Sequence, residues 1–225
     1  FAYDFQAVGL DGRVFSGAGA ILEDYFSFGA PVLAVAPGVV RAVVAGIPDN
    51  PIGVWNLAQN WGNYVIIEHP DGRFSCVAHL RQGSIGVVPG QSVRRGEPLA
   101  ACGNSGRSLF PHLHFQLQSH PWIGASTLEF VFSNLGVWPS GLRRHAVLSE
   151  GDRVWNLPVF PTGAGPSADP ELLPVLEEGS ALEWSGDRDL RSGRVSAFLG
   201  IRMKEENRHR LRDRKSTRLN SSHRT

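Results

Sequence analysis

Residues 110–118 show a regular alternation of apolar and polar side chains. Because side chains alternate between the two faces of a β-strand, this pattern predicts two sets that point in opposite directions. The apolar set is Leu113, Phe115 and Leu117, and the polar set is His112, His114, Gln116 and Gln118. We therefore expect a half-buried strand with a polar outer face, on which two His share one side.

The same period of two recurs in short runs between turn residues. In residues 1–5 it places Tyr3 and Phe5 on one face and Asp4 on the other. Residues 62–69 and 74–80 flank a Pro-Asp-Gly turn, which predicts a β-hairpin. Within its second strand, alternation places His79 on the face opposite Cys76. These runs, with further short strands in residues 31–45 and 87–102, predict a mainly β fold.

Composition and net charge argue against two classes of function, nucleic-acid binding and spanning a membrane. The 225 residues include 26 Gly and 15 Pro, and the formal net charge is +1. So small a charge gives no strong field for nucleic acid, and no apolar run is long enough to span a bilayer. The chain begins at Phe1 rather than Met, so we interpret it as a fragment whose missing signal peptide says nothing about export.

Three regions are expected from changes in composition. Residues 1–132 form the core, and residues 133–200 form a β-rich extension of unknown role that includes a Gly- and Pro-rich linker at 161–170. From Arg202 onward the chain becomes dense in Arg, Glu and Asn and poor in apolar residues, and residues 201–225 are taken as a separate region. We expect this last region to be a disordered or artefactual tail.

The two Cys, Cys76 and Cys102, form no CxxC or CxxH pair, which favours two buried apolar residues over a thiolate site. The remaining His fit no ligand spacing and are expected to be structural or exposed; they are His69, His120, His145, His209 and His223.

Several motifs in order resemble the M23 (lysostaphin/LytM-type) zinc metalloendopeptidases, which cut peptide bonds in bacterial peptidoglycan. They are Asp4, the segments 29–34, 62–69, 78–80 and 88–96, Gly103-Asn104-Ser105-Gly106, and Pro111-His112-Leu113-His114-Phe115. The resemblance covers roughly the first 120 residues. It implies an antiparallel β-sheet whose catalytic strands form the floor of a substrate groove.

The resemblance also implies the site residues. Asp4 matches the Asp of an H-x-x-x-D motif and His114 the second His of H-x-H, and both are metal ligands in the family. His112 and His79 match the two catalytic His beside the zinc-bound water. The His of H-x-x-x-D would stand one residue before Phe1, outside this sequence, and Val77 stands where many members have Tyr.

These residue types suit zinc chemistry. A catalytic zinc takes three protein ligands, keeps one position for water and lowers the pKa of that water toward 7. His112 would then take the proton of the water, and His79 would hydrogen-bond the water or the developing oxyanion. Gln116 could orient a ligand, although ordinary exposure to solvent is the favoured interpretation.

Two alternatives remain beside an exported enzyme of the periplasm or cell envelope that acts on peptidoglycan peptides. One is a catalytically inactive relative that binds the cell wall or regulates another hydrolase. The other is a lipoyl- or biotin-carrier domain, suggested by the turns in residues 88–96, but both Lys lie in the tail. Groove specificity is expected in the loops at residues 9–29 and 47–61, where a buried role is favoured for Trp55 and Trp61.

Overall fold

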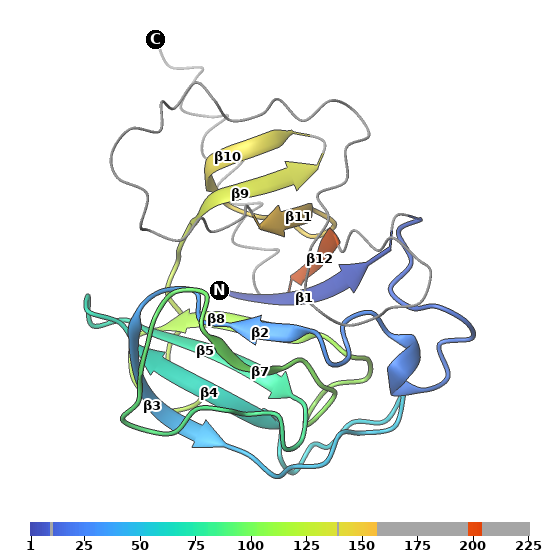
Figure 1. The fold of residues 1–225 in the computed structure, drawn as a ribbon, viewed down its shortest axis with the longest axis horizontal. Helices are drawn as coiled ribbons and strands as arrows, with labels where there is room; N and C mark the ends of the chain where they lie inside the picture. Colours follow the sequence, from blue (N-terminus) through green and yellow to red (C-terminus); the bar gives the residue numbers. More distant parts are fainter. Residues whose placement is uncertain (10, 139, 157–197, 204–225) are drawn as a thin grey trace, which may run out of the picture.

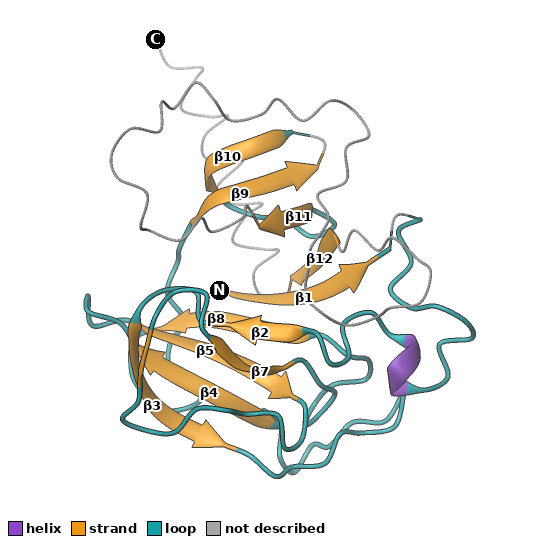
Figure 2. Ribbon diagram, viewed as in Figure 1, coloured by secondary structure: helices purple, strands orange, loops and turns teal. Residues whose placement is uncertain are grey.

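The computed structural model describes residues 1–9, 11–138, 140–156 and 198–203. Regular structure there is almost entirely β-strand, as the sequence predicts, with one short 3₁₀ helix, η1 (Leu22–Asp24) (Figure 2). Within these residues no helix is both long enough and apolar enough to cross a lipid bilayer.

The strands form two antiparallel sheets. Their bounds are β1 (Ala2–Val8), β2 (Pro31–Leu33), β3 (Gly38–Val44), β4 (Asn63–Glu68), β5 (Phe74–Leu80), β6 (Ser92–Val93), β7 (Pro98–Ala101), β8 (Leu113–Gln118), β9 (Phe132–Trp138), β10 (Gly141–Ala146), β11 (Arg153–Asn156) and β12 (Phe198–Met203). The large sheet has the order β10-β9-β11-β12-β1-β8-β5-β4-β3-β6 (Figure 1). The small sheet pairs β2 with β7.

The predicted hairpin is present as β4 and β5. Glu68 pairs with Phe74, and the turn is closed by the Gly72 amide, which donates to the His69 carbonyl over 3.0 Å. β5 then pairs with β8, and β8 pairs with β1. The first and the last strand of the resemblance therefore lie side by side, although more than one hundred residues separate them.

One apolar core holds these strands together. Tyr3 and Phe5 of β1 and Phe115 of β8 are buried in it, and Phe130 and Phe132 pack edge-on against Tyr3 with ring centroids 5.4 and 5.2 Å away. Burying large aromatic side chains of this kind contributes about 1.5–3 kcal/mol each. The apolar face of β1 is therefore fixed, and Asp4 must point to the opposite face.

The extension continues the same sheet. Buried residues of β9, β10 and β11 belong to the cluster that contains Tyr3; they include Leu135, Val137, Ala146 and Val154. The expected boundary between residues 132 and 133 falls inside β9, at its first residue. Residues 157–197 of the expected extension lie outside the described residues.

The start of the expected tail needs correction. Residues 201–203 belong to β12, which pairs antiparallel with β1: Met203 lies opposite Tyr3 and Arg202 opposite Asp4. The apolar Ile201 and Met203 fit a strand, and β1 offers an edge on which they can pair. The rest of the expected tail, residues 204–225, lies outside the described residues.

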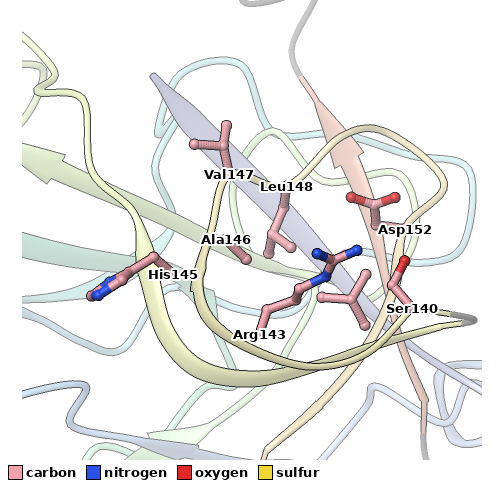
Figure 3. A pocket seen from close by; sticks show the side chains of 8 residues that line it. Ser140, Arg143, His145, Ala146, Val147, Leu148 and Asp152 are labelled. Carbon is pink, nitrogen blue, oxygen red and sulfur yellow. The ribbon is translucent and has the colours of Figure 1, made fainter.

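A hollow of about 290 Å³ opens on the extension. Figure 3 shows the side chains around it, which are Val137, Ser140, Arg143, His145, Ala146, Val147, Leu148 and Asp152. None of the predicted site residues lines it. The candidate site must therefore be sought on the other side of β1.

The loop before β8 packs so closely on the loop before β4 that a side chain at Gly106 has no room. Gly106 has φ +80°, and a Cβ atom there would lie 2.3 Å from the Gly62 amide nitrogen. Gly72 has φ +77° with nothing within 4 Å of such an atom. The two glycines share a left-handed backbone conformation, but only Gly106 lacks room for a Cβ atom.

We therefore expect Gly106→Ala to destabilise the protein more than Gly72→Ala. Gly72→Ala should cost about 1–2 kcal/mol, the strain of a left-handed non-glycine residue. Gly106→Ala adds the displacement of a backbone segment and should cost at least about 1 kcal/mol more. Urea denaturation of both variants measures the difference, and equal midpoints would contradict the close approach.

Candidate metal centre

The pairing of β1 with β8 brings the two predicted ligands together. Asp4 lies directly opposite His114 in the register, and both side chains point away from the apolar core. Asp4 Oδ1 is 2.8 Å from His114 Nδ1. His114 is fully buried, whereas the Asp4 side chain keeps 17% of its surface exposed. A carboxylate oxygen and an imidazole nitrogen thus meet at the edge of a partly open site.

The two predicted catalytic His lie beside this pair. The rings of His79 and His112 have centroids 4.8 Å apart, and the rings of His79 and His114 are 5.8 Å apart. His112 Nε2 lies 3.9 Å from Asp4 Oδ1. All four residues predicted from the sequence therefore converge, from β1, the end of β5 and the start of β8.

His79 reaches the site through a distortion that alternation does not predict. Its φ is +62°, the only positive value among the described non-glycine residues, and the β4–β5 register shifts beside it. A β-bulge of this kind re-aims a side chain. Cys76 pairs with Gln116 and therefore lies on the face of the site. The expectation that His79 and Cys76 occupy opposite faces is wrong, because the period of two breaks at the bulge.

Neighbouring loops hold the bulge in place. The His79 carbonyl accepts the Gly103 amide over 3.0 Å, and His79 Nδ1 lies 2.8 Å from the Ser105 carbonyl oxygen. Left-handed backbone in a non-glycine residue costs on the order of 1–3 kcal/mol and persists only where its surroundings enforce it. The segment at residues 103–105 provides that enforcement.

Both catalytic candidates have a defined tautomer when neutral. A carbonyl oxygen only accepts hydrogen bonds, so the proton of neutral His79 must lie on Nδ1, which donates to Ser105. His112 Nδ1 likewise donates to the Phe110 carbonyl over 2.8 Å, with Ser108 Oγ 3.1 Å away. In each ring Nε2 is left with its lone pair. Both Nε2 atoms can therefore accept a hydrogen bond.

Burial sets the charge of His79. Desolvation lowers its pKa well below the usual value, and the neighbouring His112 and His114 lower it further. Its hydrogen bond to Ser105 and the nearby Asp4 oppose this shift without reversing it. Near neutral pH His79 is consequently neutral and an acceptor at Nε2.

The polar face of β8 is buried rather than exposed. The exposed fractions of His114, Gln116 and Gln118 are 0%, 2% and 0%. Gln116 Oε1 lies 3.1 Å from His114 Nε2, and Gln116 Nε2 donates to Gln118 Oε1 over 2.7 Å. The expectation of a solvated outer face, with Gln116 as an ordinary surface residue, is therefore wrong. The loop after β8 reaches this face at Gln118, whose Nε2 donates to the His120 and Trp122 carbonyls.

Two donors suit a zinc ion, and the described residues contain no third. Zinc is bound by imidazole nitrogen and carboxylate oxygen, and Asp4 and His114 present one of each within a single ion's reach. Among the residues that the structure describes, no group of three His, Cys, Asp or Glu is arranged to hold a metal ion. The donor types fit the metal, and the donor number is one short.

Other residues that the sequence singled out have structural or peripheral places. His69 is buried between the Pro37 carbonyl and Ser75 Oγ, at 2.8 and 2.9 Å from its two ring nitrogens. Burial raises the pKa of the Cys102 thiol to about 12, so it stays protonated. Trp61 packs edge-on against His114, with centroids 5.3 Å apart. Trp55 is 48% exposed, contrary to the favoured expectation of burial.

Comparison with known proteins assigns one part of the chain to a family. Residues 24–123 match the sequence profile of Peptidase family M23, and this segment contains His79, His112 and His114. The chain contains a Peptidase family M23 domain. Asp4 lies before the matched segment.

Relatives of the M23 domain include curated and solved proteins. The peptidoglycan DD-endopeptidase ShyA of Vibrio cholerae is 43% identical over 56 residues, 25% of this chain and 13% of that protein. The murein hydrolase activator EnvC of Escherichia coli is 30% identical over 88 residues, 36% of this chain and 20% of that protein. A crystal structure of a zinc-containing peptidase from Vibrio cholerae is 34% identical, covers 40% of this chain and 24% of that chain, and has a TM-score of 0.32. The chain therefore matches only a small part of each.

The lowered pKa of His79 predicts how stability depends on pH. Below about pH 6.5 the unfolded chain binds a proton at this residue that the folded M23 domain resists, so the free energy of unfolding falls as pH falls. His79→Asn removes this contribution, and Asn tolerates positive φ. Urea denaturation of the metal-free protein between about pH 7 and pH 5 should show a shallower decline for the variant. Parallel declines would show that His79 is not the group responsible.

Proposed function

We propose that the chain is the peptidase region of a zinc metalloendopeptidase that hydrolyses peptide bonds in bacterial peptidoglycan, in stem or cross-bridge peptides. The observation that supports it most is the convergence of Asp4, His114, His112 and His79. The similarity to ShyA, whose name describes a peptidoglycan endopeptidase, supports the substrate. The protein would then act in the periplasm or cell envelope, after export.

In this proposal Asp4 and His114 would hold the zinc ion through a carboxylate oxygen and an imidazole nitrogen. A bound zinc supplies positive charge that lowers the pKa of a water molecule and polarises a scissile carbonyl. The edge of Trp61 and the burial of His114 keep this side of the site dry, which strengthens electrostatic interactions there. The protein's part is to fix two donors and to exclude solvent behind them.

His112 is the better placed general base. Its Nε2 carries a lone pair and lies 3.9 Å from the Asp4 carboxylate, which stabilises the charge that His112 gains with a proton. His79 resists protonation because it is buried. As a neutral Nδ1–H tautomer it accepts a hydrogen bond from the attacking water and does not donate one to an oxyanion. The two His therefore have different roles: His79 orients the water, and His112 takes its proton.

A second function is suggested by the similarity to EnvC. An M23 domain without a complete metal site could regulate another hydrolase, and EnvC is named a murein hydrolase activator. The described residues supply two donors and no arranged third. An activator would need the shape of the site but not its proton chemistry, so substitutions that preserve the fold separate the two functions.

We expect His112→Ala to retain zinc and to lose cleavage. General-base catalysis contributes roughly 10²- to 10⁴-fold to the rate, so turnover of purified peptidoglycan should fall by at least about 100-fold. Zinc content, measured by atomic absorption after dialysis, should be unchanged. His145→Ala, at an exposed position on the extension, is the matched control. Full cleavage by His112→Ala would remove its proposed role.

Because the site has two donors, we expect one added ligand residue to raise its affinity for zinc. A His placed directly before Phe1 would share a face with Ala2 and Asp4 if β1 continues, because strand side chains alternate. Zinc affinity, measured by competition with a chromophoric chelator, should rise at least about tenfold over a chain with Ala added there. Equal affinities would show that this position does not complete the site.

A further inference from the structure

We propose that Gln118 and Gln116 are positioning residues that set the tautomer of His114 and so direct its Nδ1 lone pair at the metal position. The inference rests on the proposed function, because it assumes that His114 is a zinc ligand. It concerns two amide side chains with no place in the catalytic scheme above. It also gives a role to the loop that follows β8.

The orientation of Gln118 is fixed by two backbone carbonyls. Its terminal nitrogen donates to the His120 carbonyl over 2.7 Å and to the Trp122 carbonyl over 3.0 Å. Carbonyl oxygens accept only, so the atom between them must be the NH₂ group of the amide. The amide oxygen of Gln118 therefore points the other way, toward Gln116.

The orientation of the Gln118 amide fixes the orientation of the Gln116 amide. The atom of Gln116 that lies 2.7 Å from Gln118 Oε1 must be a donor, hence its NH₂ group. This leaves Gln116 Oε1 facing His114 Nε2 over 3.1 Å. Both amides are buried, at 2% and 0% exposed, so water cannot substitute for either partner without cost.

The orientation of Gln116 in turn acts on the tautomer of His114. Gln116 Oε1 can only accept, so it favours a proton on Nε2, and neutral His114 in that tautomer has its lone pair on Nδ1. That lone pair faces Asp4 Oδ1 at 2.8 Å, and two acceptors at this distance repel unless they share a proton or bind the same metal ion. A chain of amides thus keeps the site in the form that binds a cation. Without it, His114 Nδ1–H could simply donate to Asp4.

The anchor of this chain is the closed loop after β8. Gln118 forms an isolated antiparallel bridge with Thr127, the Ser119 amide donates to the Ser126 carbonyl over 3.0 Å, and the Ala125 amide donates to the Trp122 carbonyl over 3.2 Å. One of these bonds is made to the Trp122 carbonyl, and together they close the loop that also carries the His120 carbonyl. The loop therefore acts on the metal position through the two amides.

Two substitutions test the proposal through the tautomer and the metal affinity. Gln118→Leu removes the anchor, so the Gln116 amide can turn and offer its NH₂ group to His114. Adding Gln116→Glu to that variant restores an acceptor beside His114 Nε2, because an ionised carboxylate cannot donate. Gln91→Leu, in the turn before β6, is the matched control.

The first readout is the long-range ¹H–¹⁵N imidazole correlation of His114 in the metal-free protein, at a pH where the ring is neutral. We expect the Nε2–H tautomer in the wild type and the control, a shift toward Nδ1–H in Gln118→Leu, and return of Nε2–H in the double variant. An Nδ1–H tautomer in the wild type would overturn the proposal.

The second readout is the zinc dissociation constant, measured by chelator competition. Residues that orient a metal ligand typically change affinity 10- to 100-fold, so we expect a loss of that size in Gln118→Leu and its recovery in the double variant. An equal loss in both variants would mean a merely structural role and would overturn the proposal. Peptidoglycan cleavage enters neither measurement, so an inactive wild type with the expected tautomer and affinities would count against the proposed function alone.

Discussion

The backbone hydrogen bonds between β1 and β8 pair Asp4 with His114, and the rest of the site depends on that register. A shift of one residue would turn Asp4 into the apolar core and bring Tyr3 or Phe5 to the polar side. Such a shift is prevented because Tyr3 and Phe5 are locked among Phe115, Phe130 and Phe132. The aromatic core thus determines the position of a carboxylate on the opposite face of the sheet.

The three His side chains reach the candidate site through different local structures. His114 arrives by regular alternation, His79 by a bulge with left-handed backbone, and His112 from the residue just before β8, where its Nδ1 donates to the Phe110 carbonyl. The bulge and the turn before β8 share one support: Ser105 accepts from His79, while Asn104 accepts from Ser108 beside His112. A single loop, residues 103–108, therefore orients both rings.

The sequence predicts those parts of the site that follow from the alternation of side chains along strands and from the order of the motifs along the chain. The hairpin of β4 and β5, the strand at β8 and the outward direction of Asp4 all follow from alternation, and the residues that converge follow from the motifs. The face of His79 does not, because one residue with positive φ reverses the alternation at that point. The burial of Gln116 and Gln118 does not either, since Gln118 is enclosed by a loop whose closure depends on backbone contacts between residues 118–119 and 126–127. Nothing in a local pattern of polar residues distinguishes a solvated face from a buried ladder of amides.

The pairing of β12 with β1 has a consequence for how a peptide can bind. An enzyme that accepts an extended peptide often adds it as an extra strand at a free sheet edge. Here both edges of β1 are occupied, by β8 on one side and β12 on the other. A peptide chain that reaches Asp4 must therefore approach across the face of the sheet, roughly over the side chains of β5 and β8. Its recognition would then rest on side-chain contacts from the flanking loops rather than on a ladder of main-chain hydrogen bonds along β1.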